Sequence, residues 1–416
     1  MTATQQHALT VVANLRDDLG PLDAVAVRMK AVRDEVNDAL KRVNTLHFAR
    51  FVLLPDEPGG PPTRLAFESN HDGPRDRHLP ALAQALAPFE DRLFVWKGYE
   101  KGSFASFAER HAVPASTFYL GHPGLSVEQI LADDGVRDRL AALLDEMDAA
   151  DDLDGKAAWQ IRDALLEKLA SDHEPRVLGA VDRGLPVQPF EERKFYLIAA
   201  GVVGAGVVGF LGPILATEAR ERADEAKPGN EPKLIGEGDR RLDAIIDHED
   251  RVTQNGLTHF VPLRPGKLRK LSMSVVLWTL EQARKKIAYH GTLGGITSIH
   301  FARWVVLPDD RVLFFSNYDG SWEAYLGDFV DKAHIYLSAV WSNTKWFPKS
   351  HALVLKGAAQ EASFKQWVRT FQVENQIWYS AYPHLTVENI LANARIREGA
   401  VGTMTDEEAR AWLALF

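Results

Sequence analysis

Apolar and polar residues alternate in the same order in two separate parts of the chain. From Ile299 to Trp322, two apolar runs rich in β-branched and aromatic residues flank a Pro/Asp turn, and the second run ends in Asn-x-Asp-Gly. From Leu46 to Gly73 the same pattern returns with a longer turn. Apolar runs of this kind around a turn predict a β-hairpin in each half of the chain.

The repeat continues on both sides of the hairpins. The string LTVVANLR from Leu9 matches LTHFVPLR from Leu257, and FYLGHPGLSVEQIL from Phe118 matches WYSAYPHLTVENIL from Trp378. Apolar residues at helical spacing predict the helices between these strands, at 22–43, 79–87, 268–289 and 321–341, the last with Ser321 as N-cap. Each half therefore predicts the order strand, helix, strand, strand, helix, strand, which is the ferredoxin-like split β-α-β unit.

The segment between the repeats has a different composition. We expect an α+β protein with two fused ferredoxin-like βαββαβ repeats, divided as repeat 1 (1–131), a helical extension (132–194), a hydrophobic segment (195–216), a charged linker (217–252) and repeat 2 (253–416). The hydrophobic segment has no charged residue and is long enough to span a bilayer as a helix. We expect it to attach the protein to a membrane, with the other domains in the cytoplasm; whether it spans, re-enters or lies on the membrane stays open, and a buried Gly/Ala-rich helix is the alternative.

Composition narrows the classes of function. The 416 residues, 46% of them hydrophobic, suffice for two or more cores, and the absence of cysteine excludes disulfides and thiolate ligands. The net charge of -9 argues against a nucleic-acid partner. The acidic run Asp145–Asp154 lacks the ligand spacing of a calcium loop, and no Walker loop, nucleophile elbow or zinc-binding helix is present. Membrane lipid, an apolar small molecule and a second copy of the chain remain as expected partners.

The order and duplication of these elements resemble the dimeric α+β barrel superfamily, which includes chlorite dismutases, dye-decolourising peroxidases and small cofactor-free monooxygenases. The resemblance covers about residues 9–131 and 257–398. It implies a pseudo-dimeric α+β barrel and an oxidoreductase, haem-dependent or cofactor-free, that acts on an apolar substrate. The Gly-x-x-Asp-Gly motif of the peroxidases is not matched, because Ser69 and Ser316 stand where its first Gly would be.

The second repeat supplies the candidate site residues. Eight of the ten tryptophans follow residue 270, which predicts either an apolar pocket or a heavier core. Because residues two apart on a strand share a face, Arg303 is predicted to contact a carboxylate across the hairpin, and we propose Arg303, Asp319 and Tyr318 as catalytic residues. His334 occupies the kind of helical position that holds the axial histidine of haem in the resembled superfamily.

A second hypothesis gives these residues a structural role. Polar residues present in both repeats are more typical of a staple than of two identical active centres; they are His47/His300, Arg50/Arg303, Asn70/Asn317 and Asp72/Asp319. Residues that differ between the repeats are the better functional candidates, namely Glu68/Phe315, His71/Tyr318 and His122/Tyr382. The protein would then be a non-catalytic, membrane-tethered ligand-binding or scaffolding protein.

Overall fold

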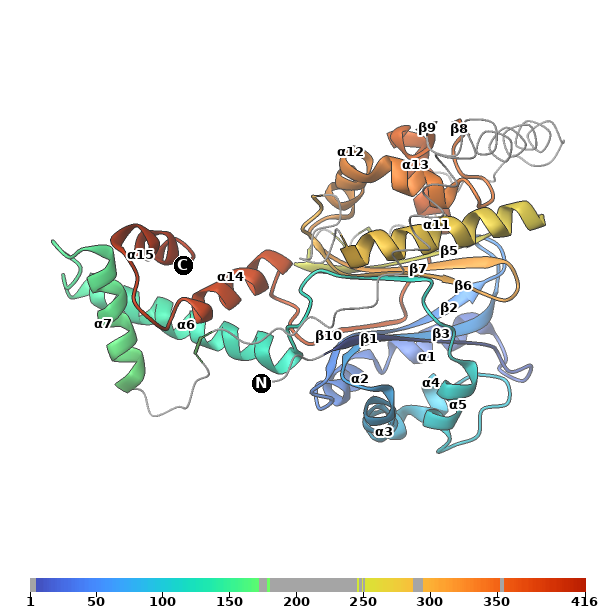
Figure 1. Ribbon diagram of the computed structural model, residues 1–416. Coiled ribbons are helices and arrows are strands. Elements are labelled where there is room, and N and C mark those ends of the chain that lie inside the picture. The colour runs from blue at the N-terminus through green and yellow to red at the C-terminus, as the bar shows by residue number, and fades with distance from the viewer. Residues whose placement is uncertain are drawn as a thin grey trace.

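The computed structural model describes residues 5–171, 178–179, 245–246, 249, 251–286, 295–351 and 355–416. Two four-stranded antiparallel sheets face each other, and helices cover their outer sides (Figure 1). The first sheet has the order β1 (Gln6–Asn14), β3 (Pro62–Asp72), β2 (Leu46–Pro55), β10 (Ile377–Ser380). The second has the order β4 (Thr117–Leu120), β6 (Ile299–Val306), β7 (Arg311–Asp319), β5 (Gln254–Pro262). A short pair, β8 (Ser350–His351) and β9 (Leu355–Lys356), lies apart from both.

The two repeats exchange their last strands. β4, from the first repeat, pairs with β6 of the second, and β10, from the second repeat, pairs with β2 of the first. The backbone shows the crossing: Val113 donates to Thr10 O on β1, whereas Ser116, three residues later, donates to Trp304 O on β6. The predicted α+β class agrees with these sheets. Two self-contained ferredoxin-like repeats are not confirmed, because neither repeat keeps its fourth strand in its own sheet.

Helices of each repeat pack on the outer face of one sheet (Figure 1). The first repeat contributes α1 (Leu22–Lys30), α2 (Arg33–Leu40), α3 (Arg75–Leu86), η1 (Ala87–Phe89), α4 (Glu90–Leu93) and α5 (Phe104–His111). The second contributes α11 (Lys267–Lys286), α12 (Trp322–Trp341), η2 (Gly357–Ala359) and α13 (Glu361–Phe371). The helix predicted over 22–43 is divided between α1 and α2, because Val32 leaves the helical conformation and is buried.

Three apolar layers hold this body together. Phe51, Phe67 and Trp96 belong to the core under the first group of helices. A matching core under the second group contains Phe314 and Trp367 among others. Between the sheets, the apolar contacts gather at two ends, around Phe48 and Phe301 at one end and around Val305 and Phe260 at the other. Burying one such side chain stabilises the fold by about 1.5–3 kcal/mol.

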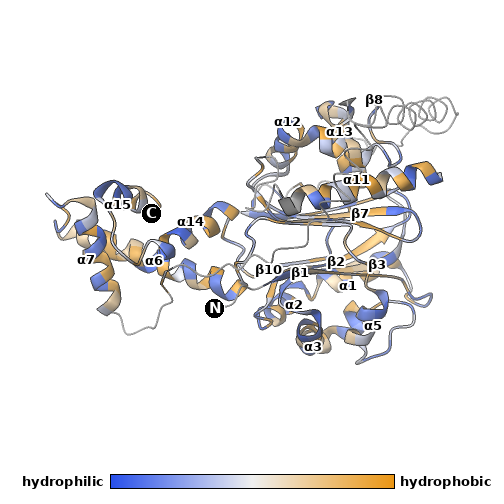
Figure 2. Ribbon diagram, viewed as in Figure 1, coloured by the Kyte–Doolittle hydropathy of each residue, from blue (hydrophilic) through white to orange (hydrophobic). Residues whose placement is uncertain are grey.

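A group of four helices extends to one side of the sheets (Figures 1 and 2). It consists of α6 (Val127–Ala149), α7 (Ala158–Ser171), α14 (Val387–Glu398) and α15 (Asp406–Leu413), so both repeats contribute to it. Ser126, Thr386 and Thr405 are N-caps whose hydroxyl oxygens each accept a backbone N–H of the first turn. The acidic run at 145–154 lies at the end of α6 and in the turn that follows.

The hydrophobic segment 195–216 lies outside the described residues, as does most of the charged linker. Within the part of the chain that the structure describes, no helix has the length and apolar character needed to cross a membrane.

Candidate functional site

A β-bulge in each central strand turns two consecutive side chains towards the space between the sheets. The strand register shifts between Leu46 and Phe48 in β2 and between Ile299 and Phe301 in β6. A bulge sets two residues against one on the partner strand, which interrupts the alternation of faces. His300 therefore faces the same way as Phe301, and its ring lies 5.2 Å from that of Phe48 on the opposite sheet. The prediction from simple alternation, that the two residues face opposite ways, is wrong for this reason.

A chain of polar side chains crosses between the repeats at this end of the sheets. Its members are buried or nearly so and follow one another as Asp72, His47, Tyr382, His122, His300 and Asp319. The distances along the chain are 2.9 Å (Asp72 Oδ1 to His47 Nε2), 2.8 Å (His47 Nδ1 to Tyr382 Oη), 3.4 Å (Tyr382 Oη to His122 Nε2), 3.4 Å (His122 Nε2 to His300 Nδ1) and 2.7 Å (His300 Nε2 to Asp319 Oδ1). Burial lowers the pKa of His122 well below its usual value and raises the pKa of Tyr382, so both stay neutral.

The two aspartates at the ends of this chain also hold the group of four helices formed by α6, α7, α14 and α15. Asp72 Oδ2 accepts the backbone N–H of Val127 at 2.8 Å, and Asp319 Oδ2 accepts that of Val387 at 2.8 Å. These residues begin α6 and α14, where a carboxylate stabilises the unpaired N–H groups and the positive end of the helix dipole. Each Asn-x-Asp-Gly aspartate thus joins a histidine of its own repeat to a helix N-terminus.

Two arginines and one glutamate form a second buried cluster in the middle of the space between the sheets. Arg50 Nε lies 2.7 Å from Glu68 Oε1, and Arg303 Nη2 contacts Glu68 Oε2. Burial is the largest cause that lowers the pKa of Arg50, to about 9, and it lowers that of Arg303 as well. The ring of Phe315, which stands where the first repeat has Glu68, lies 5.2 Å from the Arg50 guanidinium and 5.7 Å from that of Arg303. We call Arg50, Glu68 and Arg303 the arginine cluster.

The three residues predicted to be catalytic do not converge. Arg303 belongs to the arginine cluster, so its carboxylate partner is Glu68 of the other repeat and not a residue of its own hairpin. Asp319 is paired with His300. Tyr318 faces away from the space between the sheets, into the core under the helices of the second repeat. Its ring stacks there on that of Tyr325 at 3.9 Å, and burial raises its pKa. Two of the residues that differ between the repeats, Glu68 and His122, do lie between the two sheets and contact residues of both repeats. Comparing the repeats was therefore the better way to predict which residues meet there.

His334 does not line the cavity among the aromatic residues of the second repeat. His334 is partly exposed on α12, and its Nδ1 lies 2.9 Å from Val330 O in the preceding turn. The cavity bordered by Tyr325, Trp341 and Trp367 has a volume of about 20 Å³, enough for a water molecule and far too small for haem. The aromatic enrichment therefore builds a heavier core. Within it lies His259, whose pKa burial lowers to about 3.

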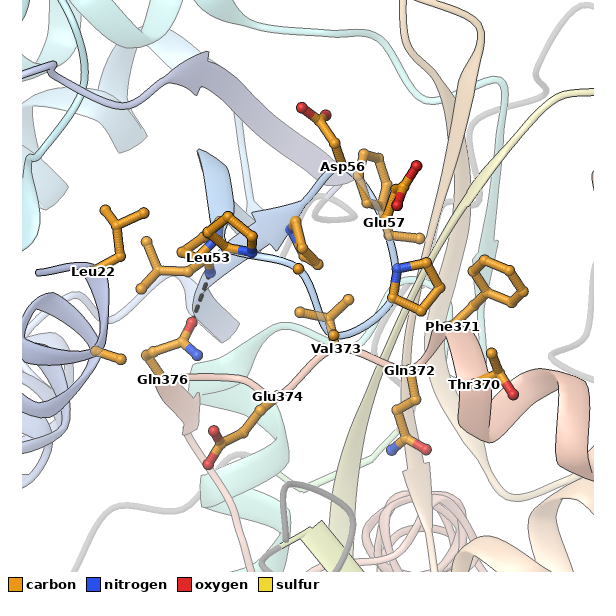
Figure 3. Close-up of a pocket in the computed structure, with 18 of the residues that line it drawn as sticks. Leu22, Leu53, Asp56, Glu57, Thr370, Phe371, Gln372, Val373, Glu374 and Gln376 are labelled. Atoms are coloured by element: carbon orange, nitrogen blue, oxygen red, sulfur yellow. Dashed lines mark hydrogen bonds between the residues drawn. The ribbon is translucent and has the colours of Figure 1, made fainter. Parts of the chain in front are cut away.

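A surface cavity of about 480 Å³ lies where the two repeats meet at the other end of the sheets (Figure 3). One wall comes from α1, the end of β2 and the turn that follows it; the other comes from β5 and residues 370–376. Gln376 Oε1 accepts the backbone N–H of Leu53 at 2.6 Å and joins the walls (Figure 3). The apolar residues that line the cavity include Leu22, Leu53, Phe260, Phe371 and Val373. The charged residues that line it are Asp23, Asp56, Glu57 and Glu374. We call this cavity the acidic pocket, since no basic side chain is among the described residues that line it.

The four carboxylates of the acidic pocket differ in how far they are already neutralised. Asp56 contacts Arg64 at 2.9 Å and Arg311 at 3.3 Å, and Glu374 contacts Lys30 at 2.5 Å. Asp23 and Glu57 are exposed and have no ion pair with another described residue. The pocket therefore keeps negative charge that a ligand can neutralise.

A larger groove, of about 870 Å³, runs beside α2, the start of β5 and β10. Its charged groups are of both signs, and most of its carboxylates have a partner within the protein. Asp38 pairs with Lys41 at 2.8 Å, and Glu249 pairs with Arg369 at 2.8 Å. The groove thus offers less uncompensated charge than the acidic pocket.

No protein-family model and no curated protein matches the chain.

Proposed function

We propose that this protein is a non-catalytic ligand-binding protein and that the acidic pocket binds an organic cation with an apolar body. A volume of about 480 Å³ falls within the range of small-molecule sites, which are mostly apolar with a few polar groups that orient the ligand. The apolar lining would cover the body of the ligand, and Asp23 and Glu57 would face its positive charge. This proposal refines the expected apolar small-molecule partner by adding a charge.

The observation that carries this proposal is the turn between β2 and β3. In the second repeat the corresponding turn is short, Pro308-Asp309-Asp310, whereas the first repeat inserts a turn with Pro58, Pro61 and Pro62 that lines the pocket. Proline restricts the backbone, so this wall is shaped before a ligand arrives and less conformational entropy is lost on binding. The insertion is a difference between repeats that the shared fold does not require.

A non-catalytic role is supported by what the repeated polar residues do. His47, Arg50, Arg303 and Asp319 are engaged with other side chains or with a helix N-terminus. Such contacts hold the two sheets and the group of four helices together, as the staple hypothesis expects. The oxidoreductase expected from the superfamily resemblance stays a prediction.

We also propose that the two repeats form a single-chain counterpart of a dimeric α+β barrel. Strand exchange supports this, because each repeat completes the sheet of the other. Side chains join the sheet edges: Ser380 Oγ donates to Gln254 Oε1 at 2.7 Å across the β10 and β5 edges. At the equivalent edge, Gly124 N donates to Gln6 Oε1 at 3.3 Å. The acidic pocket lies at one such meeting of the repeats.

Calorimetric titration with matched probes tests the function. Hexylamine, hexanol and hexanoate share an apolar chain and differ in charge, so the proposal expects affinity to fall in that order. The variant Asp23→Asn/Glu57→Gln should weaken hexylamine binding about 2- to 30-fold, because each exposed ion pair contributes about 0.2–1 kcal/mol. The matched control Asp34→Asn/Asp38→Asn removes the same charge from the larger groove and should bind as the unmodified protein does. Equal affinity for hexanol and hexylamine, or an effect of the control alone, would overturn the proposal.

A further inference from the structure

We propose that the arginine cluster binds a small monovalent anion, of the size of chloride or bromide, beside Arg303. The proposal is independent of the acidic pocket and concerns the space between the two sheets.

The charges of the cluster do not balance. Arg50, Arg303 and Glu68 are each at most 1% exposed, and two guanidinium groups share a single carboxylate. Among the described residues, no second carboxylate forms an ion pair with either arginine. A buried charge without a partner is costly, and arginine does not relieve that cost by losing its proton as readily as lysine does. One negative charge is needed to neutralise the cluster.

The unpaired donors indicate where that charge would lie. Arg50 reaches across to the second sheet and donates to Leu257 O at 2.8 Å, to Ser316 O at 3.1 Å and to Asn317 Oδ1 at 2.5 Å. Arg303 reaches across to the first sheet and donates to Ser69 O at 3.2 Å. Its Nε and Nη1 atoms are buried and have no hydrogen-bond partner among the described residues.

Two further polar groups of the first sheet lack partners as well. Asn70 Nδ2 and Thr10 Oγ1 are buried without a hydrogen bond in the described part of the structure. Both residues belong to the first sheet, where Thr10 lies directly opposite Glu68 on the neighbouring strand. Their counterparts in the second repeat are satisfied: Asn317 accepts from Arg50, and Thr258 Oγ1 donates to Asn375 Oδ1 at 2.6 Å. Of these two pairs of equivalent residues, only those of the first sheet have side-chain atoms without a partner in the described part of the chain.

The occupant must be small, singly charged and able to accept several hydrogen bonds. Complete burial of the cluster leaves no route for a large organic acid to lie there with its body outside. A halide ion beside Arg303 could accept hydrogen bonds from Arg303 Nε and Nη1, and Asn70 Nδ2 and the Thr10 hydroxyl are the other unpaired donors of the first sheet. A water molecule could take the same hydrogen bonds and would leave the charge uncompensated.

Thermal unfolding at constant ionic strength distinguishes these occupants. The proposal expects the midpoint to rise by about 2–4 °C or more when sodium chloride or bromide replaces sodium gluconate, because a ligand of the folded state stabilises it. The variant Phe315→Glu supplies a second carboxylate between the arginines and should abolish this halide dependence. The control Phe315→Leu removes the ring but adds no charge, so it should retain the dependence.

Crystals of the unmodified protein grown in bromide provide a measurement that does not rely on a variant's folding. The expected result is an anomalous bromide peak within hydrogen-bond distance of Arg303 Nε. A midpoint that does not respond to halide, together with no anomalous peak, would overturn the proposal and leave water as the occupant. A halide dependence that persists unchanged in a folded Phe315→Glu variant would overturn it as well.

Discussion

Arg50 and Arg303 occupy equivalent positions in the two repeats, yet both reach the same carboxylate, that of Glu68. Exact symmetry would give each arginine its own glutamate, but the second repeat has Phe315 at that position. The two repeats thus place their arginines equivalently and differ at the residue, Glu68 or Phe315, that decides the net charge of the arginine cluster. The stability of the folded protein should therefore depend on the carboxylate of Glu68.

Replacing Glu68 by Gln should destabilise the protein by about 3–5 kcal/mol, because it removes the one carboxylate that pairs with both buried guanidinium groups among the described residues. Urea unfolding followed by circular dichroism measures the change. Glu323→Gln is the matched control, since Glu323 is 67% exposed and its ion pair with Lys365 contributes at most about 1 kcal/mol. Equal effects of the two substitutions would show that Glu68 does not neutralise the arginines.

Replacing Asp319 by Ala should destabilise the protein by about 2–4 kcal/mol, because His300 loses its acceptor and the first N–H of α14 loses its cap. The free energy of unfolding should fall by less than about 0.5 kcal/mol in Asp328→Ala, which removes only an exposed pair with Lys332. An Asp319→Ala variant as stable as this control would contradict the role assigned to the aspartate.

His259 should make the protein less stable as the pH falls. Its folded pKa of about 3 lies below the usual value of 6.5, so the unfolded chain takes up the proton first. The contribution is therefore complete above pH 6.5 and is lost towards pH 3, by about 1.4 kcal/mol per unit. Between pH 6.5 and about pH 5, His259→Phe should lose about 2 kcal/mol less stability than the unmodified protein does. Parallel pH curves for His259→Phe and the unmodified protein would contradict the assignment.

Two glycines should respond in opposite ways to replacement by alanine. A methyl group on Gly121 would overlap the carbonyl oxygen of Ile299, at the point where β4 meets β6. Gly121→Ala should therefore cost more than about 1 kcal/mol, as overpacking does. A methyl group on Gly135, on the exposed side of α6, meets nothing within 4 Å, and Gly135→Ala should stabilise by about 0.5–1 kcal/mol. Chemical unfolding of both variants checks the close approach of the exchanged strand.

Much of the local structure could be predicted from residue patterns. The two hairpins lie where the alternation places them, and α12 begins directly after its predicted N-cap Ser321, whose hydroxyl accepts the Ala324 N–H at 3.2 Å. Periodicity and capping are local properties, so a single sequence is sufficient to show them.

The pairing of the strands could not be predicted in this way. β4 and β10 have the same pattern as strands that would stay in their own repeat, and which edge they join is decided by the packing of the whole chain. The bulge at His300 was missed for a related reason, because alternation assumes one residue per position along a strand. The predicted contact of Arg303 with a carboxylate of its own hairpin failed for a different reason, since the residue opposite Arg303 on β7 is Phe315 and the carboxylate it reaches is Glu68 of the other repeat. The difference between Glu68 and Phe315 was visible, but its consequence required knowing that the two arginines meet.

Hexylamine binding by a variant with a shortened β2–β3 turn would show whether the acidic pocket is the ligand site. Replacing residues 57–63 by a single Asp leaves two residues between Pro55 and Arg64, which is the length of the corresponding turn, Asp309-Asp310, in the second repeat. The replacement also removes one wall of the acidic pocket. Circular dichroism and the unfolding midpoint would establish that the sheets are retained. We predict that calorimetric titration then shows hexylamine affinity reduced at least about tenfold, a loss of about 1.4 kcal/mol. Unchanged affinity in a folded variant would contradict the claim that this pocket is the ligand site.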